Sequence, residues 1–266
     1  NQLAVSKTMV FDLEKIRYQF DAVKPDFVIV SHASNVFGLI APVEDIFTMA
    51  KKYDAITLVD MAQTAGLVDL NVGLSTIDFA VFAGHKTLYG PTGISGFVMN
   101  PAVKFPAVIF GGTGYESANQ SMPEDLPQKY EMGTLNIAGI AGLNAALGWT
   151  SQVTVDAIRE KETENRKKLI NLLEKYSYIK IIGNYDSCDY VGIVSCIITG
   201  ISSDSAGPVF DRCGISVRTG LQCAPLSHQF MGTFPAGTIR FSVNYFTSDK
   251  DFAELEEALD YIDSEL

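Results

Sequence analysis

Basic residues are scarce in this chain of 266 residues. Lys and Arg together number 20, against 31 Asp and Glu, which gives a formal net charge of -11 at pH 7. Binding to nucleic acid depends on clustered Lys and Arg that neutralise phosphates, and no basic patch stands out in this sequence. We therefore expect no nucleic-acid partner, whereas an acidic surface could attract a basic protein.

Long apolar runs and closely spaced cysteines are also absent. No stretch approaches the roughly 20 apolar residues that span a membrane, and the sequence opens with no signal-peptide pattern. The four cysteines form no Cys-x-x-Cys pair and show no metal-ligand spacing. We therefore expect no membrane span, no bound metal, and a chain suited to the reducing cytoplasm.

Hydrophobic residues make up 47% of the chain, which is enough for a sizeable core. In the first part of the sequence, short apolar runs alternate with helical or crossover segments. This alternation predicts an α/β fold with a mostly parallel sheet covered by helices on both faces. The expected strands are residues 27–30, 56–59, 79–82 and 94–99, with a helix at 43–53.

The pattern changes after two expected helices, residues 137–150 and the long charged stretch 155–176. We therefore predict a large domain over residues 1–159 and a smaller C-terminal α+β domain over residues 160–266. Its expected strands are 179–182, 192–199, 215–219 and 238–244, with helices near 203–213 and 248–264.

Lys86 is the first candidate for chemistry. It follows an apolar run, residues 79–83, and precedes a glycine-rich stretch. An ammonium at the exit of a buried strand is costly to desolvate, so such a lysine is paired, deprotonated or covalently joined to a carbonyl group. A solvated surface lysine is the alternative.

Asp60 is the second candidate, because it ends the preceding expected strand, residues 56–59. Open α/β sheets bind ligands at the carboxyl ends of their strands, so Asp60 and Lys86 should face one crevice. Pyridoxal phosphate needs such a pair: a lysine for its aldehyde and a carboxylate for its pyridine nitrogen. A helix N-cap is the alternative role for Asp60.

Six segments together resemble a known family, the class V, fold-type I pyridoxal-phosphate enzymes, and within it the cysteine desulfurase and selenocysteine lyase branch. They occur in the family's order over nearly the whole chain, and the resemblance implies the large domain of a pyridoxal-phosphate transferase, N-terminally truncated. The segments are SHASNVFG (31–38), VDMAQ (59–63), GHK (84–86), GTLN (133–136), VRTGLQCAP (217–225) and GTIRFS (237–242).

The resemblance implies a role for each matching residue around the cofactor. Lys86 resembles the lysine that forms the Schiff base, and Asp60 the partner of the pyridinium nitrogen. Gln63 resembles the hydrogen-bond donor to the phenolic oxygen, and His85 a phosphate contact. Thr134 resembles the residue that reaches the phosphate of a neighbouring subunit, which implies a homodimer with shared sites.

Substrate binding is implied for Asn35 and Arg240, which resemble the groups that hold the substrate carboxylate. The planar fork of Arg can bind a carboxylate through two hydrogen bonds. Arg218 is placed with these substrate-binding residues, and its charge could also favour the thiolate of nearby Cys223.

Cys223 decides between reactions. In the desulfurases that the chain resembles, a thiol on this loop attacks the sulfur of the bound cysteine, leaving a persulfide on the enzyme and alanine as product; the selenium of selenocysteine, a better leaving group, could depart without this attack. A sulfur-acceptor protein is then a possible partner. A small buried thiol is the structural alternative, although Gly220, Gln222 and Pro225 favour a loop. Two functional alternatives stay open: another class V aminotransferase or lyase, and a non-catalytic remnant that dimerises or binds a sulfur-transfer partner.

The chain departs from the family pattern in two ways that weaken phosphate binding. Family members begin earlier and carry there a helix N-terminus, a ready-made anion site. Position 83 is Ala83, where the family usually has a serine. We therefore expect weak cofactor retention unless another chain supplies the segment. His32 and His228 are expected to be hydrogen-bonded structural histidines.

Overall fold

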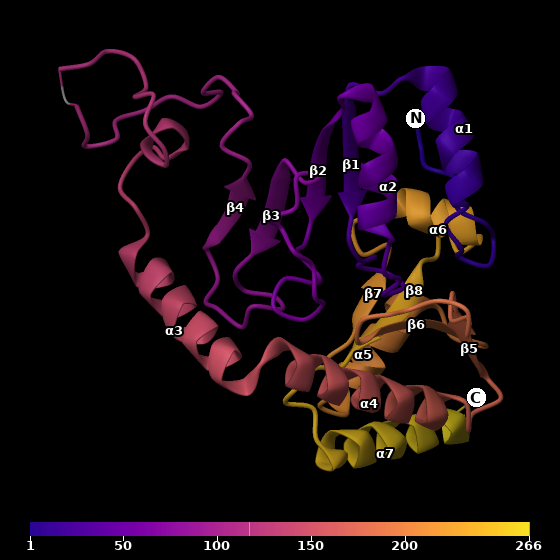
Figure 1. Ribbon diagram of the computed structural model, residues 1–266. Coiled ribbons are helices and arrows are strands. Elements are labelled where there is room, and N and C mark those ends of the chain that lie inside the picture. Colours follow the sequence, from indigo (N-terminus) through magenta and orange to yellow (C-terminus); the bar gives the residue numbers. More distant parts are fainter. Residues whose placement is uncertain (117, 266) are drawn as a thin grey trace.

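The computed structural model describes residues 1–116 and 118–265, which form two lobes around two separate sheets (Figure 1). The first lobe contains α1 (Leu13–Val23), β1 (Phe27–Ser31), α2 (Val43–Ala50), a short 3₁₀ helix η1 (Lys51–Tyr53), β2 (Ile56–Asp60), β3 (Phe79–Ala83) and β4 (Ser95–Met99). The segment 100–136, called the arm below, follows and contains the short 3₁₀ helix η2 (Gln128–Tyr130). It leads into α3 (Ile137–Val153) and α4 (Val155–Leu173). The second lobe contains β5 (Ile179–Ile182), β6 (Ile193–Ile198), α5 (Ser203–Arg212), β7 (Arg218–Gly220), α6 (Pro225–Met231), β8 (Thr238–Ser242) and α7 (Asp249–Glu265).

The first sheet has the order β1-β2-β3-β4 and is mostly parallel, as the sequence predicts. Strands β1, β2 and β3 run in the same direction, and β4 is antiparallel to β3. The register places Ser31 beside Asp60, and Asp60 beside Val81. The carboxyl ends of three strands therefore meet at one edge of the sheet, which is where such sheets bind ligands.

Helices α1 and α2 cover one face of this sheet. Their buried side chains Ile16, Phe20, Ile46 and Phe47 pack with inward-facing strand residues such as Val59 in one core. Alternate residues of a strand point to opposite faces, so the buried positions of β1 and β2 all lie on this side. The alternation of buried and less buried residues along β1 and β2 therefore identifies the face that α1 and α2 cover.

The opposite face is covered only in part, which differs from our expectation of helices on both faces. Phe27 is 41% exposed, Ile29 61% and Phe97 45%. Turns rather than helices connect β2 to β3 and β3 to β4 in the described chain, so these connections place no helix on this face. Two aromatic residues of the arm pack on it instead: the ring of Phe105 lies 5.6 Å from that of Phe79, and the ring of Tyr130 lies 5.8 Å from that of Phe97.

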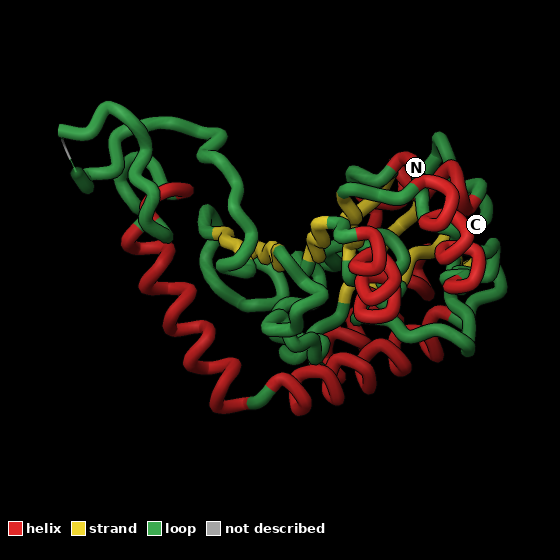
Figure 2. Tube along the Cα trace, turned by 45° about the horizontal axis from the view of Figure 1, so that its top comes forward, coloured by secondary structure: helices red, strands yellow, loops and turns green. Residues whose placement is uncertain are grey.

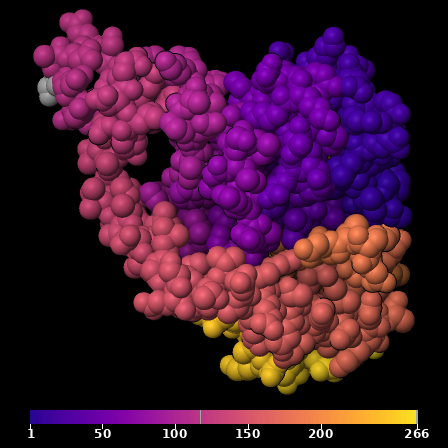
Figure 3. Space-filling view, in the orientation of Figure 1, coloured from indigo at the N-terminus to yellow at the C-terminus, as the bar shows by residue number. Residues whose placement is uncertain are grey.

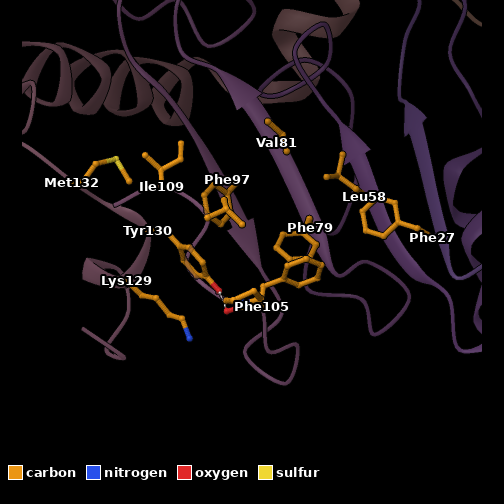
Figure 4. Close-up of a pocket in the computed structure, with 12 residues that line it drawn as sticks. Phe27, Leu58, Phe79, Val81, Phe97, Phe105, Ile109, Lys129, Tyr130 and Met132 are labelled. Carbon is orange, nitrogen blue, oxygen red and sulfur yellow. Dashed lines mark hydrogen bonds between the residues drawn. The ribbon is translucent and has the colours of Figure 1, made fainter. Parts of the chain in front are cut away.

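An apolar cavity of about 350 Å³ lies between the arm and this face (Figure 4). Its lining residues are Phe27, Leu58, Phe79, Val81, Phe97, Phe105, Pro106, Val108, Ile109, Lys129, Tyr130 and Met132. Because none of them is a carboxylate and only one is a cation, this cavity lacks the groups expected around a charged cofactor.

The second sheet is antiparallel, with the order β5-β6-β8-β7. Leu169 of α4, Phe210 of α5 and Leu259 of α7 are buried in its core. This is the small α+β lobe that the sequence predicts. Helix α4 runs across the expected boundary between residues 159 and 160. Ile158, before the boundary, packs with Leu67 of the first lobe, and Leu169, after it, packs in the core of the second. The placing of that boundary stays a prediction.

Two helices were not expected from the sequence. Helix α1 begins after Asp12, whose side chain accepts a hydrogen bond from the main-chain nitrogen of Lys15. Helix α6 begins at Pro225, and proline suits the first turn of a helix because it lacks an N–H that would be unpaired there. We had assigned this proline only to the loop around Cys223.

The outer part of the arm and the first turns of α3 extend away from the second lobe (Figures 2 and 3), whereas Leu143 and Trp149 of α3 pack with the lobes. Asn136 caps α3, with its Oδ1 accepting a 3.0 Å hydrogen bond from the main-chain nitrogen of Gly139. Its Nδ2 donates to the main-chain oxygen of Gly93, which ties the helix to the chain after Lys86. None of the helices in the described residues is both long enough and apolar enough to cross a membrane.

Candidate active site

A cavity of about 640 Å³ opens at the carboxyl edge of the first sheet. Asn35, Asp60, Gln63 and Lys86 line it from the first lobe, and Ala224 lines it from the second. A narrower cavity of about 220 Å³ shares Gln63 and Lys86 and includes Arg240. The fold thus brings together five of the residues singled out in the sequence: Asn35, Asp60, Gln63, Lys86 and Arg240.

Lys86 lies in a tight loop after β3. The loop is closed by a 2.7 Å hydrogen bond from the main-chain nitrogen of Gly90 to the oxygen of Gly84. A Cβ on Gly84 would lie 2.9 Å from the main-chain oxygen of Ile94, so only glycine fits this close approach. The Lys86 side chain is exposed and borders both cavities, where its amine can meet a ligand.

Aromatic rings hold the far end of this loop. Tyr89 contacts Trp149 of α3 at a centroid distance of 5.2 Å and Phe246 of the second lobe at 5.4 Å, both edge to face. Trp149 and Phe246 stack on each other at 5.2 Å. Such pairs contribute beyond the apolar area that they bury. The lysine loop is therefore fixed to both α3 and the second lobe.

Asp60 ends β2 and is half-buried. Its Oδ1 accepts a 2.9 Å hydrogen bond from the main-chain nitrogen of Ala62. This bond forms a local turn and no helix follows, so the helix N-cap alternative is wrong.

Behind this turn, His32 is buried and its Nδ1 lies 2.9 Å from Thr64 Oγ1. Burial lowers the pKa of His32 to about 4, so it is neutral near pH 7. His32 is a hydrogen-bonded structural histidine, as expected.

Arg240 crosses from β8 towards the first lobe. Its Nη1 donates a 2.8 Å hydrogen bond to the main-chain oxygen of Asn35, while its buried Nε has no partner among the described residues. Burial, and then the neighbouring charge of Arg218, lower the pKa of Arg240, whereas Cys223 acts in the opposite direction. A buried guanidinium with an unpaired N–H is a strong site for a carboxylate ligand.

Cys223 is exposed and stands on a tight turn. The main-chain nitrogen of Ala224 donates a 2.8 Å hydrogen bond to the oxygen of Leu221, and the two residues between have positive φ, +43° for Gln222 and +61° for Cys223. Asn35 Nδ2 donates a 2.7 Å hydrogen bond to the main-chain oxygen of Gln222. The buried-thiol alternative therefore does not hold for Cys223. It describes Cys196, which is fully buried and whose pKa burial raises to about 12.

Four predicted residues line neither cavity: His85, Thr134, Arg218 and Cys223, although Ala224 beside Cys223 lines the larger one. His85 is exposed beside Lys86, and Thr134 is exposed in the arm just before α3. Arg218 is exposed on β7, where its register partner on β8 is Arg240. Within the described residues, no group of three His, Cys, Asp or Glu side chains could hold a metal ion.

Glu162 borders the narrower cavity and was missed in the sequence. It is 4% exposed, and its Oε1 accepts a 2.6 Å hydrogen bond from the main-chain nitrogen of Gly192. Burial raises its pKa to about 7, although that hydrogen bond and Arg159 act against the rise. A signal was available, because Glu162 lies four residues after buried Ile158 and so on the same face of α4.

The side chains at the larger cavity fit the ring of pyridoxal phosphate. They supply the amine of Lys86 and the carboxylate of Asp60, the pair that this cofactor requires, and the amide of Gln63 lines the same cavity. Ala83 ends β3 and offers no hydroxyl for the phosphate.

Comparisons with known proteins agree with this geometry. Residues 1–255 match the aminotransferase class-V family. Curated relatives named probable cysteine desulfurase include a protein of Methanothermobacter thermautotrophicus, 31% identical over 88% of this chain and 60% of its own length. Another, from Aeropyrum pernix, is 32% identical over 88% of this chain and 59% of its own length.

The fold is shared with a solved cysteine desulfurase of Thermococcus onnurineus NA1. The two structures superpose with a TM-score of 0.91 at 26% sequence identity, over 100% of this chain and 66% of the other. The chain spans about 60% of the length of its first curated relative. With its family match, its sheet order and its lysine loop, this chain belongs to the aminotransferase class-V family.

Proposed function

We propose that the protein containing this chain is a pyridoxal-phosphate-dependent cysteine desulfurase, which removes sulfur from cysteine, or selenium from selenocysteine, and yields alanine. The observation that carries the proposal is the exposed Cys223 turn, which Asn35 ties to the rim of the cavity that Lys86 borders. The names of the curated relatives and of the solved neighbour support the same activity.

In this proposal the first lobe holds the cofactor. Lys86 would carry it on Nζ, Asp60 would keep its ring nitrogen protonated, and Gln63 would donate to its phenolic oxygen. His85 would contact the phosphate. Pyridoxal phosphate supplies an electron sink that weakens bonds to the substrate amino acid. The protein contributes the positions of these four groups, three of which meet at one cavity.

Asn35 and Arg240 would bind the substrate carboxylate, with the exposed Arg218 nearby as a second cation. Support comes from the unpaired buried Nε of Arg240, which a carboxylate oxygen would satisfy. The main chain of Asn35 already anchors the guanidinium through Nη1. The arginine is thus pre-oriented, and little freedom would be lost on binding.

Cys223 would take the sulfur. Its thiolate Sγ forms an S–S bond with the substrate sulfur as the substrate C–S bond breaks, and the carbon keeps the electron pair of that bond. The carbon then gains a proton, so cysteine and the Cys223 thiol become alanine and a Cys223 persulfide. A thiolate is the reactive form of cysteine, and positive charge nearby favours it. Arg240 is the cation whose charge interacts with Cys223, and Arg218 is its register partner on β7.

A homodimer with shared sites completes the proposal. Thr134 lies away from this chain's own cavities, in the exposed arm, and would reach the phosphate of a neighbouring subunit. The arm and α3 carry unusually exposed apolar side chains, namely Val108, Ile109, Phe110, Leu135, Ile137 and Ile140. Apolar surface of this kind marks an interface.

The acidic net charge of the chain would suit a basic sulfur-acceptor protein as a partner. The four free cysteines would suit a cytoplasmic location.

The deciding experiment is the Cys223→Ser substitution. After one turnover with cysteine, mass spectrometry of the parent should find one additional sulfur on Cys223, together with alanine. The serine variant should release no sulfide while still binding the cofactor at Lys86. Cys188→Ser, at a partly exposed thiol, is the control and should behave as the parent does. Full desulfuration by the Cys223 variant, with no persulfide on the parent, would instead indicate a simple lyase or an aminotransferase.

A further inference from the structure

A chain of buried polar side chains lies directly behind the Cys223 turn. Gln222 is 7% exposed, and His228 and Thr238 are fully buried. Gln222 Nε2 donates to the main-chain oxygen of Thr238 at 3.0 Å and to that of Arg218 at 3.3 Å. His228 Nε2 lies 3.0 Å from Gln222 Oε1, and His228 Nδ1 lies 2.7 Å from Thr233 Oγ1. The mechanism proposed above uses none of these side chains.

Main-chain partners fix the orientation of the Gln222 amide in this chain. Main-chain oxygens can only accept, so the amide nitrogen of Gln222 must face Thr238 and Arg218, and its oxygen must face His228. His228 therefore donates from Nε2. In the neutral ring Nδ1 then accepts from the hydroxyl of Thr233 at 2.7 Å, which is closer than the other acceptor of that hydroxyl, the main-chain oxygen of His228 at 3.4 Å. Burial lowers the pKa of His228, with the Leu221 main chain acting against this, so the neutral ring that this arrangement needs is favoured.

The turn itself needs such support. Gln222 and Cys223 both have positive φ, a conformation that is unfavourable for residues with a Cβ. Tight turns with two such residues usually contain Asn-Gly or a similar pair. Neither residue here is glycine, so contacts outside the turn must hold it. Asn35 of the first lobe holds its main chain, and the Gln222 side chain anchors it to the second lobe.

We propose that His228 is a positioning residue, which fixes the Gln222 side chain through its Nε2–H and thereby holds the turn that carries Cys223, next to Ala224 at the wall of the Lys86 cavity. The role of Cys223 in this statement rests on the proposed function. The support that His228 gives to the turn does not depend on that function. The positioning role of His228 and the chemical role of Cys223 can therefore be tested separately.

The test compares two substitutions in the full chain. His228→Phe keeps a ring but removes the donor, whereas His228→Gln keeps an N–H near the position of Nε2. The first measurement is hydrogen–deuterium exchange of residues 221–224, where the Ala224 amide is protected by its bond to Leu221. We expect roughly tenfold faster exchange in His228→Phe, the effect of losing one such hydrogen bond, and near-parent exchange in His228→Gln.

The second measurement is made with cofactor and cysteine. His228→Phe should slow persulfide formation on Cys223 by about the same factor, with KM for cysteine and cofactor loading on Lys86 unchanged, and His228→Gln should restore the rate. If the parent forms no persulfide, the proposed function fails, while the exchange measurement still tests the positioning role.

Three results would overturn the positioning role. One is parent-like exchange at residues 221–224 in His228→Phe. Another is an equal increase in exchange rate in His228→Phe and His228→Gln, spread over α6 and β8. That result would mean that His228 contributes only its volume to the packing. If His228→Phe does not fold, Gln222→Met breaks the same bond from its other end and should loosen the same four residues. Unchanged exchange in that variant is the third.

Discussion

Asn35 Nδ2 donates a 2.7 Å hydrogen bond to the main-chain oxygen of Gln222, a residue 187 positions away in the sequence. Arg240 returns a bond from the second lobe to the main-chain oxygen of Asn35. One residue of the first lobe therefore contacts both the candidate carboxylate-binding arginine and the turn that carries Cys223. The two lobes meet at the position where the proposed chemistry needs both.

Asn35→Ala should impair both the positioning of the Cys223 turn and the binding of the substrate carboxylate. It removes a hydrogen bond worth about 1 kcal/mol, so persulfide formation should slow about fivefold, and KM for cysteine should rise because a carboxylate contact is lost. Steady-state and single-turnover kinetics separate the two effects. Asn71→Ala is the matched control, since Asn71 Oδ1 accepts only from the nearby main-chain nitrogen of Gly73. Parent kinetics in Asn35→Ala would contradict this role.

Lys86 should be the residue bonded to pyridoxal phosphate. Incubation with the cofactor, borohydride reduction and peptide mass mapping should place the adduct on Lys86, because its amine borders the cavity that Asp60 also lines. Lys86→Ala should abolish the adduct, and Lys52→Ala, at another exposed lysine, should leave it intact. An adduct on a different lysine, with Lys86 unmodified, would refute the assignment.

Glu162 should make the protein less stable as the pH rises. Its pKa is about 7 in the fold against the reference value of 4.5, so the folded state holds the proton more tightly than the unfolded chain. The stabilisation is complete below pH 4.5 and is lost as the pH rises through 7. The difference between the two pKa values corresponds to about 3 kcal/mol in the free energy of unfolding.

Glu162→Gln should remove this pH dependence, because the amide stays neutral and its oxygen can still accept from Gly192. Urea unfolding at pH 5 and pH 8 measures the effect, and Glu257→Gln, at an exposed position on α7, should keep the slope of the parent. A parent and a Glu162→Gln variant that lose stability in parallel would show that another group titrates.

The exposed apolar side chains of the arm and α3 should form the dimer interface. Sedimentation at micromolar concentration should give a dimer, and Ile137→Glu should shift it towards monomer, since Ile137 is 67% exposed on α3 and a buried unpaired carboxylate is costly. Tyr261→Glu places the same charge on α7, far from α3 (Figure 1), and should leave the dimer intact. A monomeric parent would argue against shared sites.

Much of the candidate site could be predicted because it follows from local rules. Asp60 and Lys86 each follow an apolar run, and parallel strands bring such positions to one edge of a sheet, where both residues line one cavity. Gly220 and Pro225 predicted a loop around Cys223, and the thiol is exposed there. The helix after that loop was missed, although a proline at its first position was an available signal.

The sequence alone predicts the α/β class, the mostly parallel first sheet, the small second lobe and the pairing of acid and lysine at the strand ends. Each depends on periodicity or backbone preference over a few neighbouring residues. Four features become visible only in the folded chain. Asn35 holds the Cys223 turn, and Arg240 keeps a buried Nε with no partner among the described residues. Gln222 and His228 form a buried chain, and one face of the first sheet is partly open. These features join residues far apart in sequence, and their geometry is set by how the two lobes pack rather than by local preference.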